Sequence, residues 1–191
     1  MAAFGAVLDA CVLVPTALCD TLLRLADRDL YRPIWSARIL AEMRQAVLEV
    51  HPGLDAGRVD ARIRSMNAAF EDACVSGWEG LVAGIRLPDP DDRHVVAAAL
   101  RGRAEAIVTA NLRDFPADAL EPLGLHAVSP DDFLLDQLDL DPAGTVELLG
   151  EQARDKKRPP ATVEDVLGAL GRAGAPRFSA AVAALLTESG A

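Results

Sequence analysis

Four acidic side chains occur where a metal ligand would be useful, although they lie far apart in the sequence. Each falls at the end of a predicted element or on a helix face: Asp9, Glu42, Asp92 and Asp114. Carboxylates that cluster repel one another unless a cation neutralises them. A site built only from oxygen ligands suits a hard cation, Mg²⁺ or Mn²⁺, rather than zinc. Such sites commonly act on phosphate esters, so the four acids point to phosphodiester chemistry.

Each of these acids also has an ordinary structural explanation. Asp9 could end a strand and cap the helix that follows it, because Asp is a common N-cap residue. Asp91 or Asp92 could cap the next helix in the same way. Glu42 could lie on a solvated helix face, and Asp114 could hold a turn. Taken singly, none of them establishes a site.

The joint pattern favours a site. Glu42 lies beside Met43 and borders the apolar stripe of its helix, where a carboxylate is costly to bury without a partner. Thr109 and Asn111 follow another predicted strand and supply a hydroxyl and an amide, which can orient carboxylates and metal-bound water. We therefore predict that Thr109 and Asn111 support the acids.

The elements that must position these residues alternate between strand and helix patterns. Short apolar or alternating runs predict strands at 6–9, 31–35, 77–87, 106–109 and 125–128. Apolar residues at helical spacing predict helices that begin near Pro15, Ser36, Ala56, Asp91 and Ser129. Alternation of this kind predicts an α/β fold, a mostly parallel sheet with helices on both faces. Ligands of such sheets bind beyond the carboxyl ends of the strands, where Asp9, Asn111 and Asp114 should lie.

The pattern changes near Gln137, after which only helices are predicted. They cover 142–154, 163–170 and 176–186, and Thr162 with Asp165 resembles a capping box at the start of the second. We predict a nuclease-like domain over 1–136 and a helical extension over 137–191. The extension could be a packing lid, an oligomerisation element or a docking surface for a partner, and no residue in it suggests catalysis.

Several segments together resemble a known family. They are Val7-Leu8-Asp9, the lone Glu42 in its helix, the run from Asp89 to Leu100, and the run from Ala104 to Pro116. On these segments the chain resembles the PIN-domain ribonucleases, of the kind found as VapC-type toxins in bacterial toxin–antitoxin pairs. The resemblance covers roughly residues 4–135, and the last two segments are the more specific ones.

The resemblance implies a parallel sheet flanked by helices and a Mg²⁺ or Mn²⁺ site made by three or four acids. It also implies cleavage of RNA, an antitoxin protein as partner, and a homodimer as one option for assembly. Carried over to this chain, the acids are Asp9, Glu42, Asp92 and Asp114. Asp92 is preferred to Asp91 as the third acid, because it keeps the spacing to the alanine run that follows.

Two positions near these acids are left open. Asp91 or Asp89 is a candidate for an outer, supporting contact. The family often has Ser, Thr or Asn just after the first acid, where this chain has Ala10 and Cys11. The polar support of Asp9 is therefore not identified by the sequence.

Composition and charge limit the classes of partner and the cellular location that we expect for the chain. The net charge of −10 argues against a surface that grips nucleic acid everywhere, although arginine clusters near 58–64, 101–103 and 154–158 could form a local basic track. No apolar run approaches the ~20 residues that a membrane span needs. The N-terminus does not resemble a signal peptide. Three cysteines without zinc spacing are predicted to be buried thiols in a reducing cytoplasm.

The predicted activity is metal-assisted hydrolysis of RNA phosphodiester bonds. Asp9 and Asp92 would be the main ligands, while Glu42 and Asp114 would hold a second ion or its waters and orient the attacking water. No histidine is needed for this chemistry. The alternative is a non-catalytic, PIN-like module that binds a protein. A receiver-like phospho-acceptor domain is disfavoured, because neither paired acids after the first strand nor a Lys after the last is evident.

Overall fold

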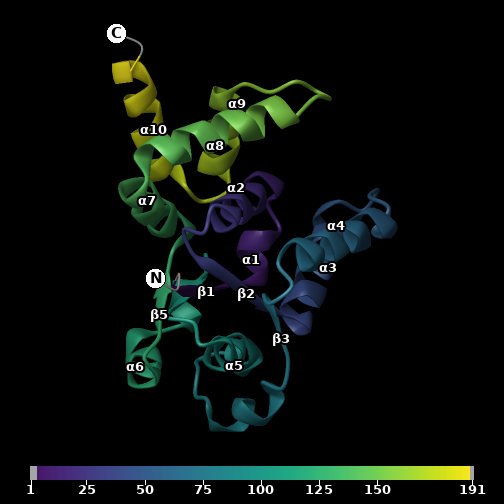
Figure 1. The fold of residues 1–191 in the computed structure, drawn as a ribbon. Coiled ribbons are helices and arrows are strands. Elements are labelled where there is room, and N and C mark those ends of the chain that lie inside the picture. Colours follow the sequence, from purple (N-terminus) through teal and green to yellow (C-terminus); the bar gives the residue numbers. More distant parts are fainter. Residues whose placement is uncertain (1–3, 190–191) are drawn as a thin grey trace. The chain divides into compact units, whose positions relative to one another are not determined.

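The first compact unit is built on a five-stranded parallel sheet. The computed structural model describes residues 4–189, and Figure 1 traces them. The strand order is β3-β2-β1-β4-β5. The strands are β1 (Gly5–Leu8), β2 (Arg32–Ser36), β3 (Cys74–Val75), β4 (Ala106–Val108) and β5 (His126–Val128). The predicted α/β fold with a parallel sheet is therefore confirmed.

The central strands are apolar along their whole length because they are buried on both faces. Val7 of β1 pairs with Ile34 on one side and with Ile107 on the other, and all three side chains are fully buried. Parallel strands covered on both faces are expected to be continuous apolar runs rather than alternating ones. This explains why 6–9 and 106–109 could be recognised from composition alone.

Helices cover both faces of this sheet (Figure 1). The chain leaves β2 through α3 (Ala37–Val50) and α4 (Ala56–Ala69), and it returns from β3 to β4 through α5 (Arg93–Gly102). These two connections run in opposite directions across the sheet. Because such crossovers are right-handed in nearly all proteins, α3 and α4 lie on one face and α5 on the other. The first unit is completed by short elements: α1 (Ala10–Leu13), η1 (Glu79–Gly84), η2 (Pro90–Asp92), η3 (Leu112–Asp114), α6 (Ala117–Leu120) and η4 (Glu121–Leu123).

The predicted strand at 77–87 is wrong. Residues Glu79–Gly84 form the 3₁₀ helix η1, none of whose residues is buried, and Leu81 is 40% exposed. The alternation there does not mark a sheet face, because no neighbouring strand covers it. The true edge strand, β3, has only two residues and pairs Trp35 with Cys74, which is too short to produce a pattern.

Two predicted helix starts in the first half of the chain are seen. Ser36 Oγ accepts a hydrogen bond from Ile39 N at 3.2 Å and so caps α3, the helix that carries Glu42. The helix predicted from Ala56 is α4, and Trp35 Nε1 donates to its Asn67 Oδ1 at 2.8 Å. The one-turn helix α1 was not predicted, and Asp9 is its N-cap.

The second compact unit is entirely helical and is not continuous in sequence. It combines 15–30 with 129–191. Its helices are α2 (Thr16–Asp27), α7 (Pro130–Leu140), α8 (Pro142–Asp155), α9 (Val163–Arg172) and α10 (Pro176–Ser189). The three helices predicted after Gln137 are confirmed, as is the Thr162–Asp165 capping box. The division into domains at 136/137 stays a prediction, and the contacts group α2 and α7 with the later helices.

Polar contacts hold α2 within this unit. Thr21 Oγ1 donates to Gln152 Oε1 at 2.8 Å, and both side chains are fully buried. Arg24 pairs with Asp155 at 2.8 Å. A buried carboxylate, Asp131, caps α10 by accepting from Phe178 N at 2.8 Å. Throughout the described chain, no helix has both the length and the apolar character needed to cross a membrane.

Candidate active site

Asp9 lies at the carboxyl edge of the sheet, where β1 and β4 end side by side. The amide of Asp9 donates to Val108 O at 3.1 Å, which continues the β1–β4 ladder and places Thr109 beside it. Asp9 Oδ1 accepts from Ala10 N at 2.7 Å, and Oδ2 accepts from the Thr109 hydroxyl at 2.7 Å. The two parallel strands thus bring an acid and its hydroxyl partner together from residues 100 positions apart.

Cys11 supplies the polar support that the sequence left unidentified. Its Sγ lies 3.1 Å from Asp9 Oδ2 and 3.5 Å from Thr109 Oγ1, and it accepts from Ala110 N at 3.3 Å. Burial of the sulfur, reinforced by the charge of Asp9, raises the pKa of the Cys11 thiol to about 12. The thiol therefore stays protonated near neutral pH and can donate its proton to Asp9.

The prediction of three buried thiols is wrong for two of them. Cys19 is buried, whereas Cys11 and Cys74 are exposed. Cys74 lies on the short edge strand β3, and Cys11 lies on α1 with its sulfur turned toward Asp9 although the residue as a whole is exposed. Neither exposed position could be inferred from the spacing of the cysteines.

Asp114 ends the 3₁₀ helix η3, which follows β4 at the same edge of the sheet. The side-chain amide of Asn111 donates to Asp114 Oδ2. The backbone amide of Asn111 donates to Thr109 Oγ1 at 3.1 Å. Asn111 thus connects Asp114 to the hydroxyl that holds Asp9, which is the kind of supporting position predicted for Thr109 and Asn111.

Asp92 stands at the start of α5 and faces the other acids. Partial burial, together with the negative charges of Asp9, Asp89 and Asp114, raises the pKa of Asp92 to about 6. The side chain caps no helix amide. The charged form of Asp92 is therefore disfavoured first by burial and then by three neighbouring carboxylates.

The two neighbouring acids behave differently from Asp92. Asp89 Oδ1 accepts from Asp91 N at 2.8 Å and caps η2, so Asp89 has a structural role as well as a charge that acts on Asp92. Asp91 is exposed. This arrangement favours Asp92 over Asp91 as the candidate for the third acid.

Glu42 lies on α3, and two neighbouring side chains, His94 and Arg38, hold its carboxylate. His94 Nε2 lies 3.0 Å from Glu42 Oε1, and Arg38 Nε donates to the same oxygen at 3.1 Å. Partial burial works to raise the pKa of Glu42, but the hydrogen bonds and charges of His94 and Arg38 outweigh it and leave the pKa lowered. His94 also acts on Asp92, since its charge works to lower the pKa of Asp92.

The carboxylates do not form a closed metal cage. Within residues 4–189, no three His, Cys, Asp or Glu side chains converge closely enough to hold a metal ion. Asp9, Glu42 and Asp114 are instead engaged by protein donors. The donor chemistry nevertheless fits a hard cation, because all four groups offer carboxylate oxygens.

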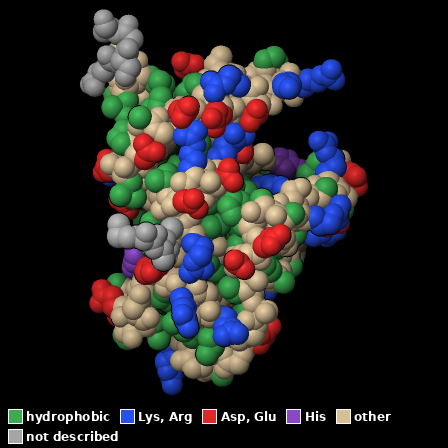
Figure 2. Space-filling view, in the orientation of Figure 1, with side chains coloured by type: hydrophobic (Ala, Val, Ile, Leu, Met, Phe, Trp, Pro, Cys, Tyr) green, Lys and Arg blue, Asp and Glu red, His purple; other side chains and the backbone are tan. Residues whose placement is uncertain are grey.

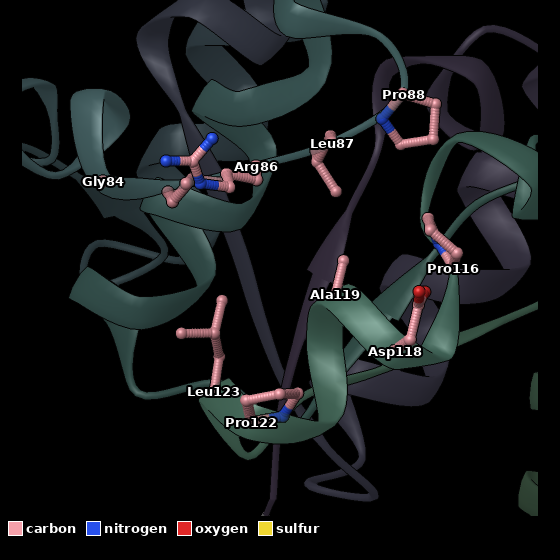
Figure 3. Close-up of a pocket in the computed structure, with 10 residues that line it drawn as sticks. Gly84, Arg86, Leu87, Pro88, Pro116, Asp118, Ala119, Pro122 and Leu123 are labelled. Carbon is pink, nitrogen blue, oxygen red and sulfur yellow. The ribbon is translucent and has the colours of Figure 1, made fainter.

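A groove of about 490 Å³ opens within the same unit (Figure 3). One wall runs from Gly84 to Pro88 and the other from Pro116 to Leu123. Pro88 immediately precedes Asp89, and Pro116 lies two residues after Asp114, so both walls lead in sequence to the acids. Arg86 and Asp118 are the charged residues among the lining side chains.

Several arginines of the predicted basic clusters have structural partners. Arg62 Nη2 donates to Leu13 O at 2.6 Å, and Arg101 Nε donates to Ser76 O at 3.0 Å. Figure 2 shows Lys and Arg side chains interspersed with acidic ones on the face drawn. A continuous basic track beside the site therefore stays a prediction.

A parallel sheet with Asp9 and Asp114 beyond the carboxyl ends of β1 and β4 defines an α/β protein with acids at the edge where such sheets bind ligands. The chain belongs to the PIN domain family, whose sequence model matches residues 5–113, more than half of the chain. The VapC50 C-terminal domain model matches residues 130–184, which lie in the helical unit. The resemblance predicted from the sequence is confirmed.

A related protein of Mycobacterium tuberculosis (strain ATCC 25618 / H37Rv) carries the name "Putative ribonuclease VapC50". It is 50% identical over 104 residues, which cover 54% of this chain and 60% of that protein. The match thus spans less than two thirds of the relative. No solved structure gives a significant match.

Proposed function

We propose that this chain is an endoribonuclease that depends on Mg²⁺ or Mn²⁺ and serves as the toxin of a toxin–antitoxin pair. The observation that carries the proposal is the series of contacts from Asp9 through Thr109 and Asn111 to Asp114, at the edge where ligands of parallel sheets bind. PIN family membership and the name of the mycobacterial relative support the choice of RNA as substrate.

The candidate site residues would have different roles in this activity. Asp9 and Asp92 would be the main ligands of the cation, with Thr109 and the Cys11 thiol holding Asp9 in place. Glu42 and Asp114 would hold a second ion or its waters and orient the water that attacks phosphorus. When bound, the metal would lower the pKa of water and neutralise charge that builds on the scissile phosphate.

The acids make RNA binding depend on the cation. A cluster of carboxylates repels a phosphodiester backbone until positive charge is supplied. The net charge of −10 adds to that repulsion. We therefore expect RNA affinity, and not only turnover, to fall when the metal is removed.

The test is cleavage of a pool of single-stranded RNA by the full chain in Mg²⁺, Mn²⁺ or EDTA, with Asp9→Asn as the matched variant. We expect metal-dependent fragments that carry 5′-phosphates, and at least about 100-fold slower cleavage by Asp9→Asn. Equal cleavage by both proteins would show that the activity does not depend on Asp9 and would contradict the proposed site. Absence of cleavage with every metal and RNA would favour the non-catalytic binding module.

An antitoxin would be expected to neutralise the acids. A segment that inserts an Arg among Asp9, Glu42, Asp92 and Asp114 would pair with the carboxylates in a bidentate way. The negative charge of the chain would speed capture of such a basic segment. The helices after Gln137 would add a second contact surface for it.

A further inference from the structure

A buried histidine that was not predicted as a site residue contacts Glu42, one of the predicted acids. His94 lies two residues after Asp92 on α5, is 2% exposed, and places Nε2 3.0 Å from Glu42 Oε1. A histidine this deeply buried is expected to use its ring nitrogens in hydrogen bonds. Its other nitrogen, Nδ1, is buried without a hydrogen-bond partner in the described chain. The hydrogen bond with Glu42 is thus the polar contact that holds the imidazole ring in place.

The direction of the hydrogen bond follows from this contact. Glu42 lacks a proton to donate when ionised, so the hydrogen between the two side chains belongs to His94 Nε2. The Trp78 ring, with its centroid 6.0 Å from that of His94, packs beside the imidazole and limits its rotation.

A second set of contacts joins α3 to η2, the 3₁₀ helix that immediately precedes α5. Arg38 Nε donates to Glu42 Oε1 at 3.1 Å, and Arg38 Nη2 donates to Asp91 O at 3.4 Å. Through His94 and Arg38, α3 is therefore tied to the segment that carries Asp92. Both donors meet Oε1, and among residues 4–189 no protein donor is found on Glu42 Oε2.

We propose that His94 is a positioning residue: with Arg38 it fixes Glu42 Oε1, so that Oε2 is presented to the cation site beside Asp92. This inference rests on the proposed function for its catalytic consequence. Partners that orient a ligating side chain typically contribute about 10–100-fold in metal affinity or activity when they are removed. His94 would act through Glu42 and would not touch the RNA.

The first test measures cleavage of a fluorescent single-stranded RNA in Mn²⁺ by His94→Leu, His94→Gln and Val96→Ala. We expect about a 10–100-fold lower kcat for His94→Leu and a smaller loss for His94→Gln, whose amide can still donate to Glu42. Val96 is fully buried on the same helix and controls for loss of packing. Equal rates for His94→Leu and Val96→Ala, at matched stability, would overturn the proposal.

A double-mutant cycle separates positioning from an independent role. If His94 acts through Glu42, then His94→Leu should have little further effect in a Glu42→Gln background. Additive losses would mean that His94 contributes on its own, and the proposal would be wrong.

A spectroscopic measurement tests the contact between His94 and Glu42 even if the chain cleaves no RNA. In ¹⁵N NMR of the imidazole, His94 should show a slowly exchanging Nε2–H whose proton shift lies downfield because a carboxylate accepts it. The signal should move upfield in Glu42→Ala and stay unchanged in Asp60→Ala, which removes a carboxylate that pairs with Arg44 instead. An unchanged signal in Glu42→Ala would contradict the proposed contact, independently of whether the protein is a ribonuclease.

Discussion

At the scale of a single residue, the raised pKa of Asp92 lowers the stability of the folded protein at neutral pH. Its pKa is raised to about 6 from an ordinary value of 3.8, so in the folded protein it holds a proton more tightly than in the unfolded chain. The contribution of Asp92 to the free energy of unfolding is fully present below its ordinary pKa of about 4 and is lost as the pH rises through about 6. Ionised Asp92 therefore destabilises the metal-free protein at neutral pH.

Asp92→Asn should accordingly stabilise the metal-free protein at pH 7.5 while abolishing cleavage. Since Asp92 is partly exposed and screened by solvent, we expect a gain on the order of 1 kcal/mol. The gain should shrink as the pH falls below about 6, because Asp92 is then protonated in the folded protein, and it should vanish only below the ordinary pKa of 3.8. Urea unfolding in EDTA at several pH values measures it, and a gain that is the same at pH 4 and 7.5 would refute the assignment of this shift to Asp92.

Cys11 offers a second prediction at the residue scale. Its thiol lies 3.1 Å from Asp9 Oδ2, so Cys11→Ala removes a donor while Cys11→Ser keeps one. We expect Cys11→Ala to weaken Mn²⁺ binding by about 10-fold and Cys11→Ser to bind as the wild type does. Calorimetric titration of both variants checks this. Equal affinities for Ala and Ser would mean that the thiol does not orient Asp9.

At the scale of elements, the cap predicted at Ser36 begins α3, the helix that carries Glu42. Ser36→Ala removes the hydrogen bond to Ile39 N at the start of α3 and should lower the free energy of unfolding by about 1 kcal/mol. Thr162→Ala, at the capping box of α9 in the other unit, is the matched control. If only Ser36→Ala also reduces metal binding, then α3 positions Glu42 as described; equal effects on metal binding would argue against it.

The sequence predicted those elements whose pattern is long or wholly apolar. The strands that became β1 and β4 could be recognised because burial on both faces requires apolar residues throughout. The segment 77–87 was misjudged, because a short alternation also occurs in the exposed 3₁₀ helix η1. The two-residue β3 exists through pairing with β2, which is tertiary information.

The same distinction applies to the site. Asp9, Asp92 and Asp114 could be proposed because acids at strand and helix ends are visible in the sequence. The contacts of Cys11 with Asp9 and of His94 with Glu42 join residues on separate elements. A lone Cys or His carries no signal of such a partner. Their positions depend on how the strands are ordered and how α5 packs against the sheet.

At the scale of the whole molecule, the proposed function predicts toxicity that depends on the acids. Expression of the wild-type chain in bacteria should slow growth, and a small partner protein should relieve it. The matched control is Asp9→Asn, which leaves the fold intact because the amide oxygen can still accept from Thr109. Growth curves at equal protein levels check this, and equal inhibition by both chains would place the cause of toxicity outside the acidic site.

The central claim is that carboxylates from separate elements form one cation site, and the melting temperature in Mn²⁺ tests it most directly. A ligand that binds only the folded state stabilises it by about 2.7 kcal/mol at 100 times its Kd, which is roughly 5–10 °C for a chain of this size. We predict such a rise for the wild type and for Asp91→Asn, and its loss in Asp9→Asn and Asp92→Asn. A melting temperature that rises equally in all four proteins, or in none, would contradict the account.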